Sequence, residues 1–461
     1  MGERCASIAS STSARAGGRG DVAMSLLRWL LVIQRETGVA ACTRILTGRS
    51  RRIPCHSRMP TPPAHPPLRN SVATQWLLNI GHAIDHMFLL IFATAVTAIA
   101  QAFGVARWED LMPYSVAAFF FFGVGSLPSG KLGDLWGRRR MMLVFFFGMG
   151  GSALLVSATQ TPLQLAFALA LLGGFASIYH PVGIPMLVQG APRPGWTIGI
   201  NGLVGNLGVA VAAVATGFLV KYFGWRMAFA LPGALCLLFG LAFALLATRE
   251  QAAPAKKKST TTAAPAGVSM ARLFLVMTIA ATSGSLLFNF STNSNYELLS
   301  DRLQAILQDP AQIGLLLAAI YAVASFTQLL VGHLIDRVAL KALYVSIVAA
   351  QAVLLGLSMV LDGWAFYAVQ FLFMATIFGA IPFTDAMIVR FVDDSLRSRV
   401  SGMRLAVSLG ASSLAVWLIG PVVKQAGFTA LLGVMAATSV VTLLIVSQLP
   451  STPAPLAPPG R

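Results

Sequence analysis

Apolar stretches of about 20 residues recur along most of the chain, and this repetition limits the folds open to it. A helix rising 1.5 Å per residue needs about 20 apolar residues to cross the hydrocarbon core of a bilayer. Hydrophobic residues make up 56% of the chain and charged residues only 11%, against roughly 25% charged in soluble domains. A barrel strand would need alternating residues over only about 10 positions. The sequence therefore predicts an all-α membrane protein, and its repeated spans exclude a soluble enzyme with a single anchor.

Twelve spans are predicted, in two groups of six. The first six cover 74–101, 111–129, 141–158, 162–189, 196–220 and 226–247. The second six cover 271–292, 313–331, 341–361, 364–389, 400–423 and 427–449. The segment between the groups is rich in Ala, Pro, Thr and Lys, which is typical of a flexible linker. We therefore predict two six-helix bundles, 71–247 and 271–450. A cytoplasmic linker at 248–270 joins them, and a disordered tail at 451–461 follows.

Basic residues gather on one side of this topology. If both termini are inside, the cytoplasmic loops include Arg138–Arg140 and Lys256–Lys258, whereas the opposite side holds few basic residues. This asymmetry follows the positive-inside rule and supports an even number of spans. The net charge of +17 then reflects topology, because a nucleic-acid partner would need basic residues gathered on one soluble surface. We expect a multi-pass protein of the plasma (bacterial inner) membrane with both termini in the cytoplasm.

Residues 1–70 do not share the pattern of spans. This segment is basic, rich in Ser and poor in acids, and the apolar patch around Arg28 is too short to span. We interpret it as a disordered cytoplasmic tail, or as sequence upstream of a true start at Met59. An organelle transit peptide is the alternative, because such peptides share this composition. Three of the four cysteines lie here, with no spacing typical of a disulfide or a metal site.

The two groups of spans carry an internal repeat. Residues 130–134 read Gly-Lys-Leu-Gly-Asp, and residues 332–336, which follow 202 positions later, read Gly-His-Leu-Ile-Asp. Pro181 in the fourth span has a counterpart within one residue of the same shift in Pro382 of the tenth. The sequence thus predicts two parallel six-helix repeats. Folds of this kind bind their substrate near the middle of the membrane, between the repeats.

Residues 72–450 resemble the major facilitator superfamily. The stretch from Gly130 to Arg140, "GKLGDLWGRRR", is similar to that family's signature loop between the second and third spans. The stretch "FGWRMAF" at 223–229 is also similar to the family. The resemblance implies a fold of twelve helices in two bundles that rock about a central cavity.

We predict that the signature loop is a conformational latch. Its glycines allow a tight turn where two helices end, and a carboxylate at a helix end pairs with a neighbouring helix N-terminus or an arginine. Such a cluster closes the cytoplasmic face while the cavity opens outward. The alternative is a topological anchor with no switching role. The predicted latch consists of Gly130, Asp134, Gly137, Arg138, Arg139, Asp336 and Arg337.

The first span contains three titratable residues in five positions, His82, Asp85 and His86. Their spacing places them on neighbouring positions of one helix face. Ionisable groups inside spans are rare and usually functional, and a carboxylate beside imidazoles can hold and release a proton near neutral pH. We predict a proton site here. The alternative is a solvated cluster at one end of the span.

Prolines interrupt the fourth and tenth spans at matching positions, which is a sequence pointer to a transporter site. In "SIYHPVGIPMLV" the two prolines remove backbone donors, so the helix is expected to bend. We predict that His180 and Asp385 face the cavity, although a structural histidine and a helix-end aspartate remain open. Asn206 in the fifth span and Asn289 in the seventh are further candidates, whereas Gly208, Ala212 and Thr216 form a packing stripe.

A narrower resemblance is to the fosmidomycin-resistance group of exporters. It rests on "GHAIDHMF", "SIYHPVGIPMLVQGA" and "INGLVGNLG". In the fourth span, Val182 and Pro185 stand where that group has Glu and Arg. Asp85 and His86 stand where it has an Asn-Asp pair.

These resemblances imply a secondary active transporter with alternating access and proton-coupled export of a small drug-like or anionic compound. An uptake permease for a small metabolite or organic acid is the alternative. No G-x-x-x-x-G-K-[ST] loop is present, so ATP is not the expected energy source. His82 and His86 alone are too few ligands for zinc, and no catalytic set is recognised. We expect no enzyme activity, catalytic residue, cofactor or metal, no nucleic-acid partner, and a monomer in the lipid bilayer.

Overall fold

The computed structural model describes residues 70–189, 191–247, 270–335, 337–391 and 394–449. The predicted tail at 1–70 and linker at 248–270 lie outside these ranges except for their last residues, and the tail at 451–461 lies wholly outside them. Contacts divide the chain into Met1–His65 and Pro66–Arg461. Every described helix belongs to the second unit.

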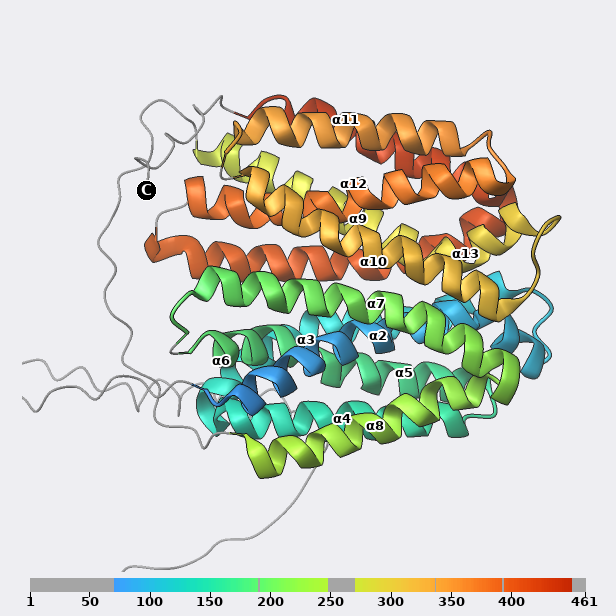
Figure 1. The fold of residues 1–461 in the computed structure, drawn as a ribbon, viewed down its shortest axis with the longest axis horizontal. Coiled ribbons are helices and arrows are strands. Elements are labelled where there is room, and N and C mark those ends of the chain that lie inside the picture. Colours follow the sequence, from blue (N-terminus) through green and yellow to red (C-terminus); the bar gives the residue numbers. More distant parts are fainter. Residues whose placement is uncertain (1–69, 190, 248–269, 336, 392–393, 450–461) are drawn as a thin grey trace, which may run out of the picture. The chain divides into compact units, whose positions relative to one another are not determined.

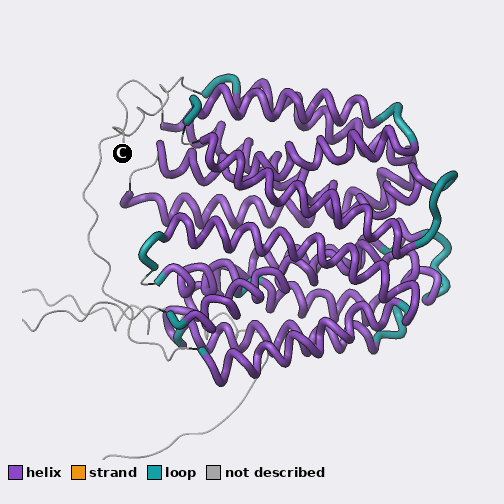
Figure 2. The backbone as a smooth tube through the Cα atoms, in the orientation of Figure 1, coloured by secondary structure: helices purple, strands orange, loops and turns teal. Residues whose placement is uncertain are grey.

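Every regular element among the described residues is a helix, and short loops join most of them (Figure 2). The first group contains α2 (Val72–Ala102), α3 (Val116–Trp136), α4 (Arg138–Ala158), α5 (Pro162–Ala176), α6 (Ile184–Val188), α7 (Pro194–Phe223) and α8 (Trp225–Leu246). Three short turns accompany them: the 3₁₀ turns η1 (Trp108–Asp110) and η2 (Met112–Ser115), and the π-helical turn η3 (Tyr179–Gly183).

The second group contains α9 (Met270–Leu303), α10 (Pro310–Ile335), α11 (Leu340–Ser358), α12 (Gly363–Phe391) and α13 (Asp394–Val446). Among the described residues, 11 helical stretches are long and apolar enough to span a membrane. The last stretch, Gly410–Val446, contains Gly427 with φ 73° and ψ 177°, so it consists of two helices. Counting it as two recovers the twelve predicted spans.

The two groups pack against each other through long helices. α7 contacts α10, and α3 contacts α13. Figure 1 shows α2–α8 on one side of the α7–α10 contact and α9–α12 on the other. The beginning of α2 and the end of α13 lie on the same side of the bundle (Figure 1), as expected for an even number of spans. We call the opposite side the distal side.

The signature loop is more helical than predicted. α3 continues through Gly130 and Asp134 to Trp136, so the chain turns at Gly137 alone. Gly137 has φ 92°, which residues with a side chain rarely adopt. Gly130 and Gly133 instead allow close packing, because a Cβ atom on Gly133 would lie 2.9 Å from the side chain of Val182 on η3. The prediction that these glycines form the turn is wrong, and their role is contact with η3.

The fourth span is interrupted as predicted, but the tenth is not. Between α5 and α6 the chain forms the π-helical turn η3, which contains Pro181. A second proline, Pro185, follows at the start of α6, so two backbone donors are missing within five residues. α12 runs as one helix through its single Pro382, because one missing donor interrupts the hydrogen-bond ladder less than two.

The predicted packing stripe of the fifth span lies against the first span. A Cβ atom on Gly208 of α7 would lie 2.1 Å from the backbone oxygen of Ala83 on α2. Ala212 and Thr216 are also buried. Small residues at this spacing allow two helix backbones to approach closely, and the approach brings α7 beside the titratable face of α2.

Candidate functional site

Four titratable residues named from the sequence meet inside the first group of helices. His82, Asp85 and His86 lie on α2, and His180 lies on η3, which contacts α2. The ring centroids of His82 and His86 are 4.7 Å apart. The ring of His180 is 5.2 Å from that of His82 and 5.9 Å from that of His86. We call these four residues the histidine cluster.

Asp85 is the most deeply buried member of the cluster, with a side chain that is 0% exposed. Its Oδ2 atom lies 3.5 Å from Nε2 of His180, and neither carboxyl oxygen accepts a hydrogen bond. Burying a carboxyl without a donor is unfavourable unless a cation or a proton accompanies it. The side chain of His180 is 22% exposed, so one member of the cluster is accessible from outside the protein interior.

Polar contacts from α7 and η3 fix the ring of His82. Its Nδ1 atom is 2.8 Å from the backbone oxygen of Asn201, and its ring stacks on Tyr179 with centroids 4.7 Å apart. The amide of Asn201 donates to the Tyr179 hydroxyl at 2.8 Å and to Oδ1 of Asn79 at 3.0 Å. Three residues of this network were not predicted as site residues: Asn79, Tyr179 and Asn201. The sequence around each of them indicates only that the residue lies in a span.

The space for the His82 ring depends on a glycine. A Cβ atom on Gly205 of α7 would lie 2.5 Å from that ring. The same helix approaches α2 closely at Gly208, three residues further along. The glycines of the fifth span therefore do more than pack two helices, because one of them also admits a side chain of the cluster.

The other predicted cavity residues lie elsewhere. Asn206 of α7 donates a hydrogen bond to Oε1 of Gln328 on α10 and so joins the two groups. Asn289 of α9 donates to Oγ of Ser412 at 2.8 Å and stays within the second group. Asp385 lies on α12, but its side chain is outside the described part of the structure. The described contacts link neither Asn206 nor Asn289 to the histidine cluster.

A buried acid that the sequence analysis missed lies between the two groups. Glu297 of α9 is 9% exposed, and its Oε1 atom accepts a hydrogen bond of 2.8 Å from the hydroxyl of Thr97 on α2. No ion pair joins Glu297 to a described residue. The predicted seventh span ended at 292, and Glu297 was not among its candidate residues. α9 in fact continues to Leu303.

The predicted latch is only partly described. The carboxylate of Asp134 is exposed and forms no ion pair with a residue in the described ranges. Arg138 donates to the backbone oxygen of Pro185 at 3.1 Å, and Arg139 to that of Ala244 at 2.5 Å. Ala244 lies near the C-terminal end of α8, where cations are favoured. Arg337 is exposed, and Asp336 lies outside the described residues, so the latch stays a prediction.

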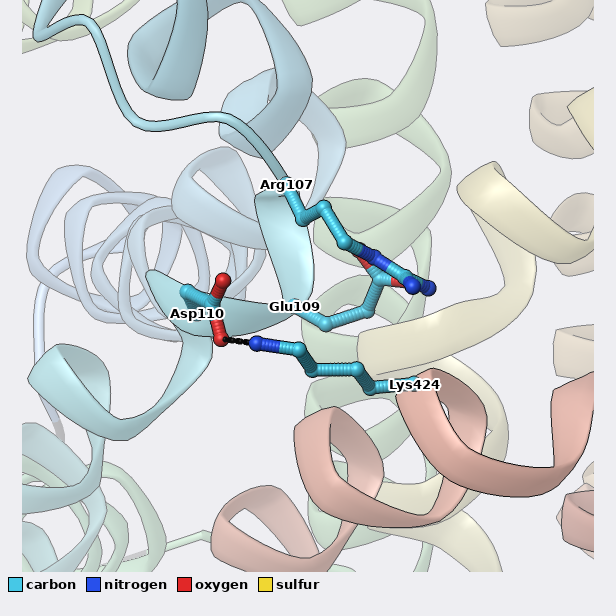
Figure 3. A network of polar contacts seen from close by, with 4 residues as sticks. All are labelled: Arg107, Glu109, Asp110 and Lys424. Carbon is cyan, nitrogen blue, oxygen red and sulfur yellow. Dashed lines mark hydrogen bonds and ion pairs between the residues drawn. The ribbon is translucent and has the colours of Figure 1, made fainter.

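Ion pairs between the two groups lie on the distal side. Lys424 of α13 pairs with Asp110 of η1, beside the Arg107–Glu109 pair of the same loop (Figure 3). Lys221 of α7 pairs with Asp309, the residue before α10.

The hydrogen bond from Lys221 lowers the pKa of the Asp309 carboxyl below its ordinary value. This carboxylate is therefore charged at neutral pH. In this conformation, charged contacts hold the distal ends of the two groups together.

The histidine cluster has the composition of a metal site. One ring nitrogen from each of His82, His86 and His180 lies within 4.8 Å of the others. The expectation of no metal rested on two histidines of one helix. His180, almost a hundred positions away in sequence, adds the third ligand, and only the packing of η3 on α2 reveals it.

Residues 78–297 match the family model of the Major Facilitator Superfamily. The matched residues extend from α2 to α9. A solved structure of a D-xylose–proton symporter has the same fold, with a TM-score of 0.66, 13% identity, and coverage of 83% of this chain and 98% of that one.

Two curated relatives of this chain are named for drug resistance. The multidrug resistance protein MdtG of Klebsiella pneumoniae is 26% identical over 64% of this chain and 71% of its own length. The puromycin resistance protein pur8 of Streptomyces alboniger is 35% identical over 23% of this chain. The match spans only 22% of that relative's length. Neither relative is named as an enzyme.

Asp134→Asn is expected to lower transport several-fold without affecting membrane insertion. The amide keeps the shape of the side chain but removes the charge that the latch needs for pairing when the distal side opens. Transport into vesicles would be compared with the yield of a fluorescent C-terminal fusion in the membrane. Unchanged transport at equal yield would rule out the latch and leave a topological anchor.

Proposed function

We propose that the chain is an alternating-access transporter that exports a small drug-like or anionic compound in exchange for protons. The single observation that carries the proposal is the buried Glu297–Thr97 contact, which crosses from one six-helix group to the other. The drug-resistance names of the relatives support export. An uptake permease for a small metabolite or organic acid is the alternative, and the experiment below separates the two.

The contacts between the groups support alternating access. The described ion pairs between groups, Lys424–Asp110 and Lys221–Asp309, lie on the distal side. On the opposite side, the signature-loop carboxylate of Asp134 is exposed. We assign this conformation to the state closed on the distal side. Following the positive-inside rule, that side faces outward, and the rocking of the groups exchanges distal pairs for the latch.

Glu297 can couple this motion to protons. Its contact with Thr97 exists only while the distal ends of α2 and α9 are together. A carboxylate buried in a span is costly, so closure of the distal side favours the protonated acid. Opening that side hydrates the acid, which then takes up a proton from the medium there. The protonated acid favours closure, and release of the proton on the opposite side completes the exchange. A proton gradient therefore biases the equilibrium between the two states, as a coupled carrier requires.

The test is transport by the purified full chain in proteoliposomes, with a panel of toxic compounds and an imposed proton gradient. Wild type is expected to move a compound against its own gradient and to stop when an uncoupler is added. Glu297→Gln is expected to lose gradient-driven transport but to keep exchange of labelled for unlabelled compound, which needs no net proton movement. Asp301→Asn is the matched control, since this acid lies one turn further on α9 and is 47% exposed.

Three outcomes would contradict the proposal. Gradient-driven transport by Glu297→Gln at the wild-type rate would remove Glu297 from coupling. If the uncoupler does not reduce transport, protons are not the driving ion. Accumulation of the compound on the side that receives the protons would make the chain an uptake permease.

A further inference from the structure

The ring of His82 has one buried nitrogen without a hydrogen-bond partner. Its Nδ1 atom lies 2.8 Å from the backbone oxygen of Asn201. A carbonyl oxygen only accepts hydrogen bonds, so Nδ1 carries the proton and Nε2 carries a lone pair. That Nε2 atom is buried and has no hydrogen-bond partner. A histidine that donates one N–H to a carbonyl and leaves the other nitrogen open has the arrangement typical of a metal ligand.

Other polar atoms of the cluster are open in the same way. Nε2 of His86 and both carboxyl oxygens of Asp85 are buried without a hydrogen-bond partner. Buried polar groups are almost always satisfied, and an ion is one explanation when several unsatisfied groups meet. Asp85 also supplies a negative charge where three imidazoles gather, which suits a divalent cation.

The distances are close to those of a metal centre. One nitrogen from each of His82, His86 and His180 lies within 4.8 Å of the others. Zinc–nitrogen bonds of about 2.0–2.1 Å in a tetrahedron place the nitrogens about 3.4 Å apart. Small rotations of the side chains would bring the nitrogen–nitrogen distances of the cluster to those of a tetrahedral site. The partial exposure of His180 provides a path for the ion to enter.

We propose that the histidine cluster binds a divalent transition-metal ion of the Zn²⁺ class, with three imidazoles and the Asp85 carboxylate as ligands. Imidazole favours zinc, cobalt, nickel and copper over magnesium and calcium, which prefer oxygen ligands. All four ligands come from α2 and η3, within one six-helix group. The ion therefore stays bound in both transport states and does not lock the two groups together. This inference does not depend on the direction or the substrate of transport.

The test is a Co²⁺ titration of the detergent-purified full chain that carries an affinity tag without histidines. Cobalt is used because its visible absorption reports both ligand type and geometry. Wild type is expected to bind one Co²⁺ per chain, with visible bands typical of nitrogen and oxygen ligands and displaced by Zn²⁺. His86→Gln and His180→Gln are expected to weaken binding by roughly tenfold or more. His333→Gln is the matched control, because His333 is exposed on α10, and its binding is expected to be unchanged.

The N-terminal region needs its own control, because it contains Cys5, Cys42, Cys55, His56 and His65. A variant with these five positions replaced by Ser or Gln is expected to keep the cobalt bands. The proposal is overturned if wild type shows no such bands, or if the bands disappear with the N-terminal substitutions. It is also overturned if His86→Gln and His180→Gln bind as tightly as wild type. If His86→Gln does not elute as a folded protein on size exclusion, His180→Gln decides, since that side chain is less buried.

Discussion

Under the proposed export, Asp85→Asn is expected to lower the resistance of a sensitive host to the compound by roughly tenfold or more. The carboxyl is 0% exposed, lies 3.5 Å from His180 and has no hydrogen-bond donor. An amide of the same shape keeps the packing but removes the charge that faces three imidazoles. Losing about 1.4 kcal/mol or more of interaction with the ion bound in the histidine cluster corresponds to a roughly tenfold or larger loss of affinity for that ion. Growth of the host on graded concentrations of the compound measures this resistance.

The control for this substitution is an acid outside the cluster. Asp301→Asn removes an equal charge from a partly exposed position on α9 and is expected to leave resistance unchanged. The level of Asp85→Asn protein in the membrane should equal that of wild type, because Asn fits the same volume. Full resistance at equal protein level would show that the histidine cluster has no part in transport.

Gly208→Ala is expected to have the largest effect on stability. The added Cβ atom would lie 2.1 Å from the backbone oxygen of Ala83, and a backbone atom cannot move aside as a side chain can. α2 and α7 must therefore separate, which costs about 1–3 kcal/mol, as overpacking in other proteins does. The separation also moves α7 away from His82, so transport should fall with stability. The measurement is the midpoint of thermal unfolding in detergent.

The same helix offers a matched control for Gly208. Gly199 of α7 has no atom within 4 Å of an added Cβ, so Gly199→Ala should leave the midpoint unchanged or raise it slightly through helix propensity. Equal midpoints for the two variants would mean that α2 and α7 are not in close contact at Gly208.

Residue pattern alone predicted most of the fold. The length and apolarity of the spans require helices, because a backbone in lipid must satisfy its own hydrogen bonds. The ends of the spans were less accurate. The predicted seventh span ends at 292, yet α9 continues to Leu303. Asn293, Asn295 and Glu297 are buried there against other helices, and a hydropathy pattern cannot distinguish burial in protein from exposure to water.

The signature loop contains glycines whose role the sequence pattern did not show. Glycines in a basic, polar stretch indicate a turn, and Gly137 does turn. Gly130 and Gly133 are helical, because their missing side chains are needed for contact with η3 and not for backbone freedom. A single sequence does not show which of these two uses a glycine serves.

The residue pattern predicts a bundle of membrane-spanning helices in two repeats, with three titratable groups on one face of the first span. These properties depend on hydrophobic length and on the periodicity of one helix, which are local. The packing of the helices brings His180 to those groups, orients His82 through Asn201, and brings Thr97 to Glu297. Such contacts depend on how helices distant in sequence pack, since close approach at Gly205 and Gly208 and the turn at η3 set the distances between their side chains.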